Sequence, residues 1–315
     1  NKKWGSFKKI NNIINKPLGS IKFKDKRYVE SEGGIYGNHG LLVNSNNQMH
    51  KFMLKSSKTK VYVGDYIKTT QVRDEQILID QPNERINVVE RFDKTGRKQI
   101  IATNVSQLLI VIAAQPEPNF LLLDKLLLVS ELMNNQATII YNKNDLHPLT
   151  NKRILTYQKL GYKLINISAK TENNVKELFD QLLNQTSFLV GQSGVGKSTI
   201  TNLLLSSHQL KTKSLSSKSN KGRHTTTTTS MYKINTNSYL IDTPGVENLH
   251  PAIKDIQDIQ HGFKEMKIHL GRCKYNDCIH ISEPHCSVKE SLDNDEIELL
   301  RYQNYQKLIE DFRQN

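Results

Sequence analysis

Cysteine is scarce in this chain of 315 residues. Three cysteines occur, and all of them lie between Cys273 and Cys286. An odd number confined to one short segment excludes a disulfide framework and is typical of a protein that folds in a reducing compartment. Metal binding is the alternative use of such a cluster.

Acidic residues are also in short supply. Asp and Glu number 31 against 44 Lys and Arg, which gives a formal net charge of +13 at pH 7. The basic residues are grouped, notably in residues 22–27 and 211–223. Clustered positive charge favours a polyanionic partner, and we expect a nucleic acid.

No apolar run is long enough to cross a bilayer. The apolar run at residues 121–129 is interrupted by Asp124 and Lys125, whereas a membrane-spanning helix needs about 20 mostly apolar residues. We therefore expect a soluble, cytoplasmic protein with no membrane partner, and a monomer.

The pattern of apolar residues changes along the chain and predicts a multidomain protein. Residues 1–18 predict a flexible basic arm. Short strand-like runs in residues 19–100 predict a small β-barrel, for which an oligonucleotide-binding barrel (OB-fold) is one candidate among several. Residues 101–262 alternate strands and helices, which predicts a doubly wound α/β domain. Residues 263–315 hold the cysteines and predict a small, mainly helical domain.

The expected elements follow from these periodicities. In the barrel, strands are expected at 21–23, 40–43, 51–54, 61–63, 66–67 and 76–80. In the α/β domain, strands are expected at 108–112, 137–141, 163–167, 187–190 and 239–241, with helices at 121–133 and 175–182. A closing helix is expected at 296–312.

A phosphate-binding loop directly follows the strand expected at 187–190. Residues 191–198, GQSGVGKS, match the pattern GxxxxGKS and precede a segment that can open a helix. Glycines let backbone N–H groups surround a phosphate chain at a helix N-terminus. Lys197 would reach the β- and γ-phosphates, and Ser198 would bind Mg²⁺. The predicted phosphate-site residues are Gly191, Gln192, Ser193, Gly194, Val195, Gly196, Lys197, Ser198 and Thr199.

A second motif, NKxD, predicts that the nucleotide is a guanine nucleotide. Asp145 can accept two hydrogen bonds from the N1–H and N2–H₂ groups of guanine, and adenine offers no such pair. We expect Asn142 to tie this loop to the phosphate loop and the stem of Lys143 to lie over the base. The remaining guanine-site residues form a third motif, SAK, which consists of Ser168, Ala169 and Lys170. The amide of Ala169 would meet guanine O6.

The fourth motif, DTPG, follows the strand expected at 239–241. Asp242 is expected in the outer shell of Mg²⁺, and the amide of Gly245 is expected to sense the γ-phosphate. Ordinary GTPases carry the phosphate loop first, then DxxG, NKxD and SAK, whereas here NKxD and SAK come first. The order predicts a circularly permuted P-loop GTPase domain.

A polar stretch at residues 206–230 predicts the switch loop. One threonine hydroxyl of such a loop binds Mg²⁺. Thr226 is the predicted ligand and catalytic residue, with Thr225 and Thr227 as alternatives.

The residue after DTPG is Val246, where many GTPases carry the glutamine that orients the attacking water. A valine cannot do this, so hydrolysis by the protein alone should be slow. His224 is the local residue whose imidazole can hold a water near neutral pH, and a solvated loop histidine is the alternative interpretation.

The cysteine cluster has the spacing Cys-x4-Cys-x-His-x5-Cys. Cys273, Cys278, His280 and Cys286 supply three thiolates and one imidazole, which is a donor set for a tetrahedral structural zinc site. His285 is a competing ligand, but it adjoins Cys286 and would have difficulty turning to the same ion.

The permuted motif order, the segment GRHTT at 222–226, DTPG followed by a hydrophobic residue, and the cysteine spacing resemble the RsgA (YjeQ/YloQ) family of ribosome small-subunit GTPases. The resemblance covers about residues 19–312. It implies an OB-fold barrel, a permuted GTPase domain and a zinc domain, acting late in maturation of the 30S subunit and its 16S-type rRNA, with hydrolysis stimulated by the 30S particle. It also implies that His224 aids hydrolysis. His285 departs from the glycine that the resemblance predicts.

We therefore expect an enzyme that hydrolyses GTP to GDP and uses Mg²⁺, with Lys197, Thr226 and His224 as its catalytic residues and one structural Zn²⁺. The alternative is a nucleotide-dependent RNA-binding clamp with negligible turnover, which Val246 leaves open. Asp145 disfavours an ATP-driven nucleic-acid enzyme.

Overall fold

The computed structural model describes residues 26–28, 39–43, 49–67, 71–73, 76–93, 95–212, 229–235, 237–243, 246 and 249–314. The predicted arm, the strand expected at 21–23 and the predicted site residues His224, Thr226 and Gly245 lie outside these ranges. None of the helices within them is both long enough and apolar enough to span a bilayer.

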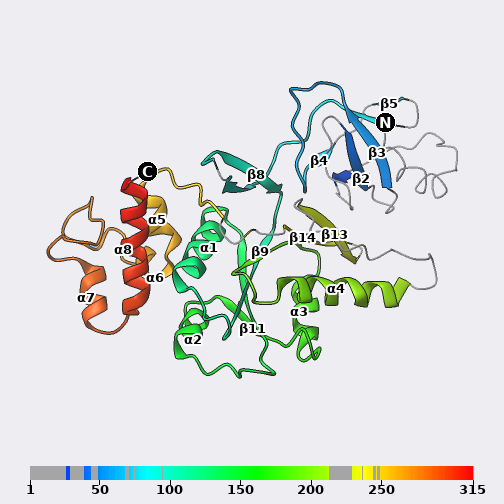
Figure 1. Cartoon of the computed structure of the whole chain (residues 1–315). Helices are drawn as coiled ribbons and strands as arrows, with labels where there is room; N and C mark the ends of the chain where they lie inside the picture. Colours follow the sequence, from blue (N-terminus) through cyan, green and yellow to red (C-terminus); the bar gives the residue numbers. More distant parts are fainter. Residues whose placement is uncertain are drawn as a thin grey trace.

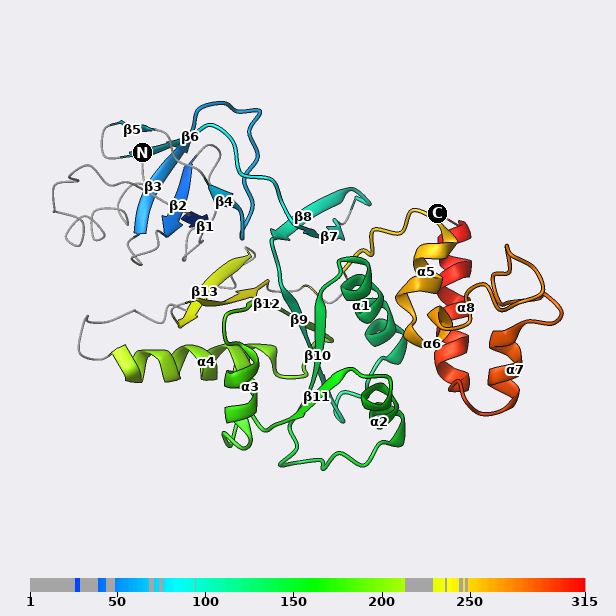
Figure 2. The same ribbon diagram turned by 180° about the vertical axis from the view of Figure 1, so that it is seen from behind.

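The first sheet contains six strands, Lys26–Tyr28 (β1), His39–Val43 (β2), Met49–Leu54 (β3), Tyr66–Ile67 (β4), Gln71–Arg73 (β5) and Gln76–Ile79 (β6). The sheet is drawn in blue to cyan in Figure 1. Its strand order is β4-β1-β2-β3-β6-β5, and all six strands are labelled in Figure 2. β1, β2 and β3 form an antiparallel meander, and β3 pairs in parallel with β6. Two of these strands, β4 and β5, are separated by three residues along the chain.

The strand predicted at residues 61–63 is wrong. Its two valines are buried, as alternating strand residues would be, but the chain turns at this point. Gly64 has a φ of +93°, and Asp65 accepts a hydrogen bond from the backbone N–H of Tyr62 at 2.8 Å. The glycine conformation and the local side-chain bond therefore override the strand pattern.

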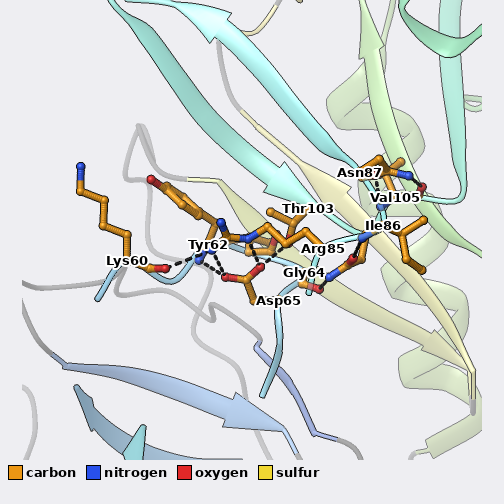
Figure 3. Close-up of polar contacts among 11 residues, drawn as sticks. Lys60, Tyr62, Gly64, Asp65, Arg85, Ile86, Asn87, Thr103 and Val105 are labelled. Atoms are coloured by element: carbon orange, nitrogen blue, oxygen red, sulfur yellow. Dashed lines mark hydrogen bonds and ion pairs between the residues drawn. The ribbon is translucent and has the colours of Figure 1, made fainter. Parts of the chain in front are cut away.

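A two-stranded antiparallel hairpin, Val88–Phe92 (β7) and Lys98–Thr103 (β8), follows the first sheet. β8 crosses the boundary predicted between residues 100 and 101. The buried carboxylate of Asp65 accepts hydrogen bonds from the Arg85 guanidinium at 2.7 and 2.9 Å and from the Thr103 hydroxyl at 2.8 Å (Figure 3). These bonds fasten the turn before β4 to the end of β8.

The central sheet also has six strands, Gln107–Ala113 (β9), Gln136–Asn142 (β10), Lys163–Asn166 (β11), Thr186–Gly191 (β12), Ser230–Asn235 (β13) and Ser238–Asp242 (β14). Their order is β11-β10-β9-β12-β14-β13, and only the β13–β14 pairing within this sheet is antiparallel. β12 lies between β9 and β14, although it follows β9, β10 and β11 along the chain. The sheet confirms the predicted α/β domain.

Helices cover both faces of this sheet. They are Phe120–Leu132 (α1), Lys152–Lys159 (α2), Val175–Gln181 (α3) and Lys197–Thr212 (α4). In β9, Leu108, Ile110 and Ile112 pack in the cluster that holds α1 and α2, whereas Leu109 and Val111 pack with α3 and α4. Since strand side chains alternate between faces, β9 is buried on both, which explains its unbroken apolar run.

The polar loop expected at residues 206–230 is wrong at its start, because helix α4 continues to Thr212. Strand β13 begins at Ser230, so the expected end of the loop agrees to within one residue.

The described part of the region predicted at residues 263–315 is mainly helical, as predicted, with Lys264–Lys267 (α6), Ser287–Asp293 (α7) and Leu299–Gln314 (α8). A further helix, Ile256–Gly262 (α5), precedes the predicted boundary. α5 and α8 pack against α1 (Figure 2, yellow to red). The contact is close because α5 presents Gly262, where an added Cβ would lie 1.9 Å from Cδ1 of Leu128. The cysteine region is thus fastened to one face of the α/β domain.

Candidate functional site

The phosphate loop joins β12 to α4 and is built from glycines that no larger residue can replace without strain. Gly191 has a φ of +147°, and an added Cβ would lie 2.2 Å from the backbone oxygen of Val111 in β9. The Lys197 ammonium group donates to the backbone oxygens of Gly191 at 2.7 Å and Gln192 at 2.9 Å. The lysine therefore folds back over its own loop, at the N-terminus of α4, where an anion is favoured.

Asn142 connects the phosphate loop to both guanine motifs. Its side chain is 2% exposed, donates to the backbone oxygen of Val195 at 2.9 Å and accepts from the N–H of Ala169 at 3.0 Å. The bond to the phosphate loop is the one that the sequence predicts. An added Cβ at Gly196, where φ is +98°, would lie 2.4 Å from Nδ2 of Asn142, so the glycine makes room for this bond.

Lys143 makes a second connection between the same loops. Its ammonium group donates to the backbone oxygens of Gly194 at 2.7 Å and Gln115 at 2.8 Å. These bonds draw the side chain across the edge of the phosphate loop, which is compatible with the predicted position of its stem over a base.

The predicted guanine reader, Asp145, is exposed at the same edge of the sheet. Ser168 is buried, and its hydroxyl accepts from the backbone N–H of Thr171 at 3.2 Å, which shapes the SAK loop. Ala169 is buried with its amide on Asn142, whereas Lys170 is exposed. The amide of Ala169 donates to Asn142 in this structure, and its contact with guanine O6 stays a prediction.

Asp242 ends β14, beside the phosphate loop. Its carboxylate accepts a hydrogen bond from the hydroxyl of Thr201 in α4 at 2.9 Å. Burial raises the pKa of Asp242, against the opposing effects of the Thr201 hydrogen bond and the Lys197 charge. Sequence reasoning missed Thr201, although its position three residues after Ser198 puts both hydroxyls on one helix face.

The DTPG segment contacts the end of the threonine run. The hydroxyl of Thr243 donates to that of Thr229 at 3.0 Å. Val246 is 2% exposed and packs in the core, so its side chain cannot reach an attacking water. Ser198 and Thr199 are exposed at the start of α4, whereas the roles of His224, Thr226 and Gly245 stay predictions because these residues lie outside the described ranges.

The four predicted zinc ligands converge. The ligand atoms of Cys273, Cys278, His280 and Cys286 lie within 4.8 Å of one another, in a group that does not include His285. Nδ1 of His280 is 3.5, 3.4 and 3.4 Å from the three sulfurs in chain order, and two sulfurs are 3.9 Å apart. Tetrahedral zinc with ordinary bond lengths requires about 3.6 Å between sulfur and nitrogen and about 3.8 Å between sulfurs. The donor set and its spacing fit zinc.

Helix α8 supports the cysteine cluster from one side. The hydroxyls of Tyr302 and Tyr305 donate to the backbone oxygens of His280 and Ile279 at 2.6 and 2.8 Å. The loop that carries the imidazole is thereby held against the helix that packs on α1.

Comparison with known proteins agrees with this geometry. The model of the RsgA GTPase family matches residues 82–251. A protein of Hahella chejuensis named small ribosomal subunit biogenesis GTPase RsgA is 34% identical over 272 residues, which cover 85% of this chain and 78% of that protein. A protein of the same name from Haemophilus influenzae strain PittGG is 31% identical over 303 residues, covering 92% and 88%.

Solved structures share the fold. The crystal structure of YjeQ from Thermotoga maritima superposes with a TM-score of 0.71 at 27% identity and covers 91% of this chain and 98% of that one. The structure of YloQ, described as a circularly permuted GTPase, has a TM-score of 0.70 at 20% identity and covers 95% and 98%. The strand before the phosphate loop comes late in the chain but lies in the middle of the sheet, and the relatives match most of the chain. The chain therefore belongs to the RsgA GTPase family of GTP-hydrolysing enzymes.

Proposed function

We propose that this protein hydrolyses GTP to GDP and phosphate while bound to the small (30S) ribosomal subunit, late in its maturation. The observation that carries the proposal is the convergence on Asn142, which joins the NKxD motif, the SAK loop and the phosphate loop at one edge of the sheet. Asp145, exposed beside it, selects guanine over adenine. The names of the relatives supply the ribosomal context.

The phosphate loop and switch loop divide the chemistry between them. Lys197 would hold the β- and γ-phosphates, and Ser198 and Thr226 would hold Mg²⁺ through their hydroxyls, with the Asp242 carboxylate supporting the ion. These are oxygen donors, which Mg²⁺ prefers, and when bound the ion neutralises charge on the phosphate oxygens. His224 orients the attacking water. The proposed nucleotide-binding residues are Asn142, Lys143, Asp145, Ser168, Ala169, Lys170, residues 191–199, Asp242 and Gly245.

The first sheet supports an OB-fold proposal for residues 19–100. The sheet order begins with β4, which pairs with β1, and ends with β5, which pairs with β6, and these two short strands are neighbours in the chain. This arrangement suits a small closed barrel, and an OB-fold is a barrel of this kind that binds oligonucleotides. With the basic arm at 1–18, it would contact 16S-type rRNA, and the GTPase domain at 101–262 and the zinc domain at 263–315 would complete the docking surface.

The buried position of Val246 supports the proposal that hydrolysis depends on the ribosome. No glutamine stands there to orient water, so the free protein turns over slowly and the 30S particle completes the site. The same observation keeps open the alternative, a nucleotide-dependent RNA-binding clamp with negligible turnover. We further propose that the protein is a cytoplasmic monomer and that Cys273, Cys278, His280 and Cys286 hold one structural Zn²⁺.

The test is multiple-turnover GTP hydrolysis by the purified protein alone, with 30S subunits and with 50S subunits. We expect stimulation of at least about tenfold, confined to 30S, since a partner that completes a GTPase site adds orders of magnitude to the rate. Lys197→Ala is the control for contaminating activity. Equal slow rates in all samples would favour the clamp.

A further inference from the structure

Thr201 occupies an unusual position for a helix threonine. In the interior of a helix, a threonine hydroxyl commonly bonds back to a carbonyl three or four residues earlier in its own helix. Thr201 is 6% exposed, and its hydroxyl instead crosses to Oδ2 of Asp242 at 2.9 Å. The bond links the second turn of α4 to the end of β14.

The same bond restricts the carboxylate. The terminal torsion of an aspartate is broad, so an aspartate without fixed partners samples many orientations. At Asp242, which is half-buried, one carboxylate oxygen is held by the Thr201 hydroxyl. A threonine hydroxyl can donate only one hydrogen bond, so Thr201 is committed to this partner. The Ser198 hydroxyl is then left for the metal.

We propose that Thr201 is a positioning residue that orients the Asp242 carboxylate toward the hydration shell of the nucleotide's Mg²⁺. This inference rests on the proposed function, because it assumes that Asp242 faces that ion. Residues that orient the groups around a metal typically change its affinity by 10–100-fold when they are removed. Thr201 should therefore affect magnesium dependence more than guanine recognition.

The experiment measures release of a fluorescent GDP, mant-GDP, from the purified full-length protein as free Mg²⁺ is varied. Thr201→Val removes the hydroxyl at nearly constant volume. We expect the Mg²⁺ concentration that slows mant-GDP release halfway to rise about tenfold in this variant. Release in excess EDTA should match wild type, and Thr201→Ser should restore the wild-type midpoint. Thr156→Val is the matched control, because the Thr156 hydroxyl bonds only within its own helix, to the backbone oxygen of Lys152 at 3.3 Å.

A Thr201→Val protein with the same Mg²⁺ midpoint as wild type would overturn the proposal. So would a Thr201→Val protein that releases mant-GDP faster than wild type by the same factor in EDTA as in Mg²⁺, since that would indicate a distorted phosphate loop. Thr201→Ala, which adds no branched side chain to α4, gives the same test if the valine variant does not fold. Failure of the wild-type protein to bind mant-GDP at any Mg²⁺ concentration would instead refute the proposed function. In the Asp242→Asn background, Thr201→Val should produce no further shift.

Discussion

The cluster around Arg301 gives a prediction whose size can be worked out from the contacts. Arg301, on α8, is 1% exposed. Its guanidinium donates to Asp124 on α1 at 2.6 Å and to the two oxygens of Glu265 at 2.5 and 2.9 Å. Asp124 also accepts from Tyr157 at 2.6 Å and Asn304 at 2.5 Å. One arginine thus neutralises carboxylates from two other helices at the contact between α8 and α1.

The perturbation is Arg301→Met, which fills much of the volume and removes the charge. It leaves two buried carboxylates without their cation, and breaking a buried pair in this way costs about 3–5 kcal/mol of unfolding free energy. Asp124→Asn should cost about 1–2 kcal/mol, because the neutral pair of Arg301 and Glu265 remains and the Asn304 amide can turn to match the new side chain. The two variants should therefore differ clearly.

The assay is urea unfolding of the full chain followed by far-ultraviolet circular dichroism. A loss of this size lowers the urea midpoint by roughly 1–2 M at an m-value of about 2–3 kcal/mol per M. An Arg301→Met midpoint equal to wild type, or equal to that of Asp124→Asn, would refute the reasoning. Lys176→Met is the control, since the Lys176 pair with Asp180 is exposed and such pairs contribute little.

The same variant should show a dependence on pH. Burial raises the pKa of Asp124 even with Arg301 opposing it, so loss of Arg301 raises that pKa further. A carboxyl whose pKa is higher in the folded state stabilises the fold when protonated, and this contribution is lost as pH rises through the folded-state value. The loss of unfolding free energy in Arg301→Met should therefore be larger at pH 8 than at pH 5.5. A loss that does not depend on pH would contradict the role given to the buried Asp124 carboxylate.

Three further predictions concern the binding sites. Asp145→Asn should weaken GDP binding by roughly 10–100-fold, because hydrogen bonds to a charged group contribute about 1.5–3 kcal/mol. A mant-GDP titration measures this affinity, and an unchanged value would show that Asp145 does not recognise guanine. Gly196→Ala should abolish nucleotide binding in the same titration, since its Cβ would collide with Asn142, whereas Gly161→Ala, with φ +79° and nothing within 4 Å, should bind normally. Normal binding by Gly196→Ala would contradict the collision with Asn142. Cys286→Ser should lower the zinc content measured by atomic emission from one per chain, with Ser282→Ala as control, and full zinc in the Cys286 variant would exclude this ligand.

The central sheet could be predicted from the sequence because its strands are buried on both faces. The strand expected at 108–112 is observed as Gln107–Ala113, and the one expected at 187–190 as Thr186–Gly191. Such strands are continuous apolar runs, and the nucleotide motifs stand at their ends. The candidate nucleotide site followed from that placement.

The sequence predictions missed helices and strands that bury little apolar surface. Helix α2, Lys152–Lys159, is eight residues long and mostly polar, with only Ile154 and Tyr157 buried, so its apolar face is too small to stand out in the sequence. Edge strand β13 sits at the end of a polar stretch, where its alternation is weak. The hairpin strand β7 and the short helices α5, α6 and α7 also depend on their packing against other elements.

Buried polar contacts outside the recognised nucleotide motifs could not be predicted either. The partners of Arg301 lie 36 and 177 residues away in sequence, so nothing in the helix pattern distinguishes it from a surface arginine. Thr201 is missed for the same reason, as Asp242 is 41 residues away. Contacts of this kind are set by the tertiary fold.

The central position of β12 has a consequence for synthesis of the chain. Strands β9, β10 and β11 emerge first and can form a parallel half-sheet with its own helices, but the edge of β9 that later pairs with β12 is then unpaired. An apolar strand with a free edge invites pairing with other chains. A nascent chain shorter than 186 residues thus carries the guanine motifs without a phosphate loop, and it needs shielding of that edge until Thr186–Gly191 has been made.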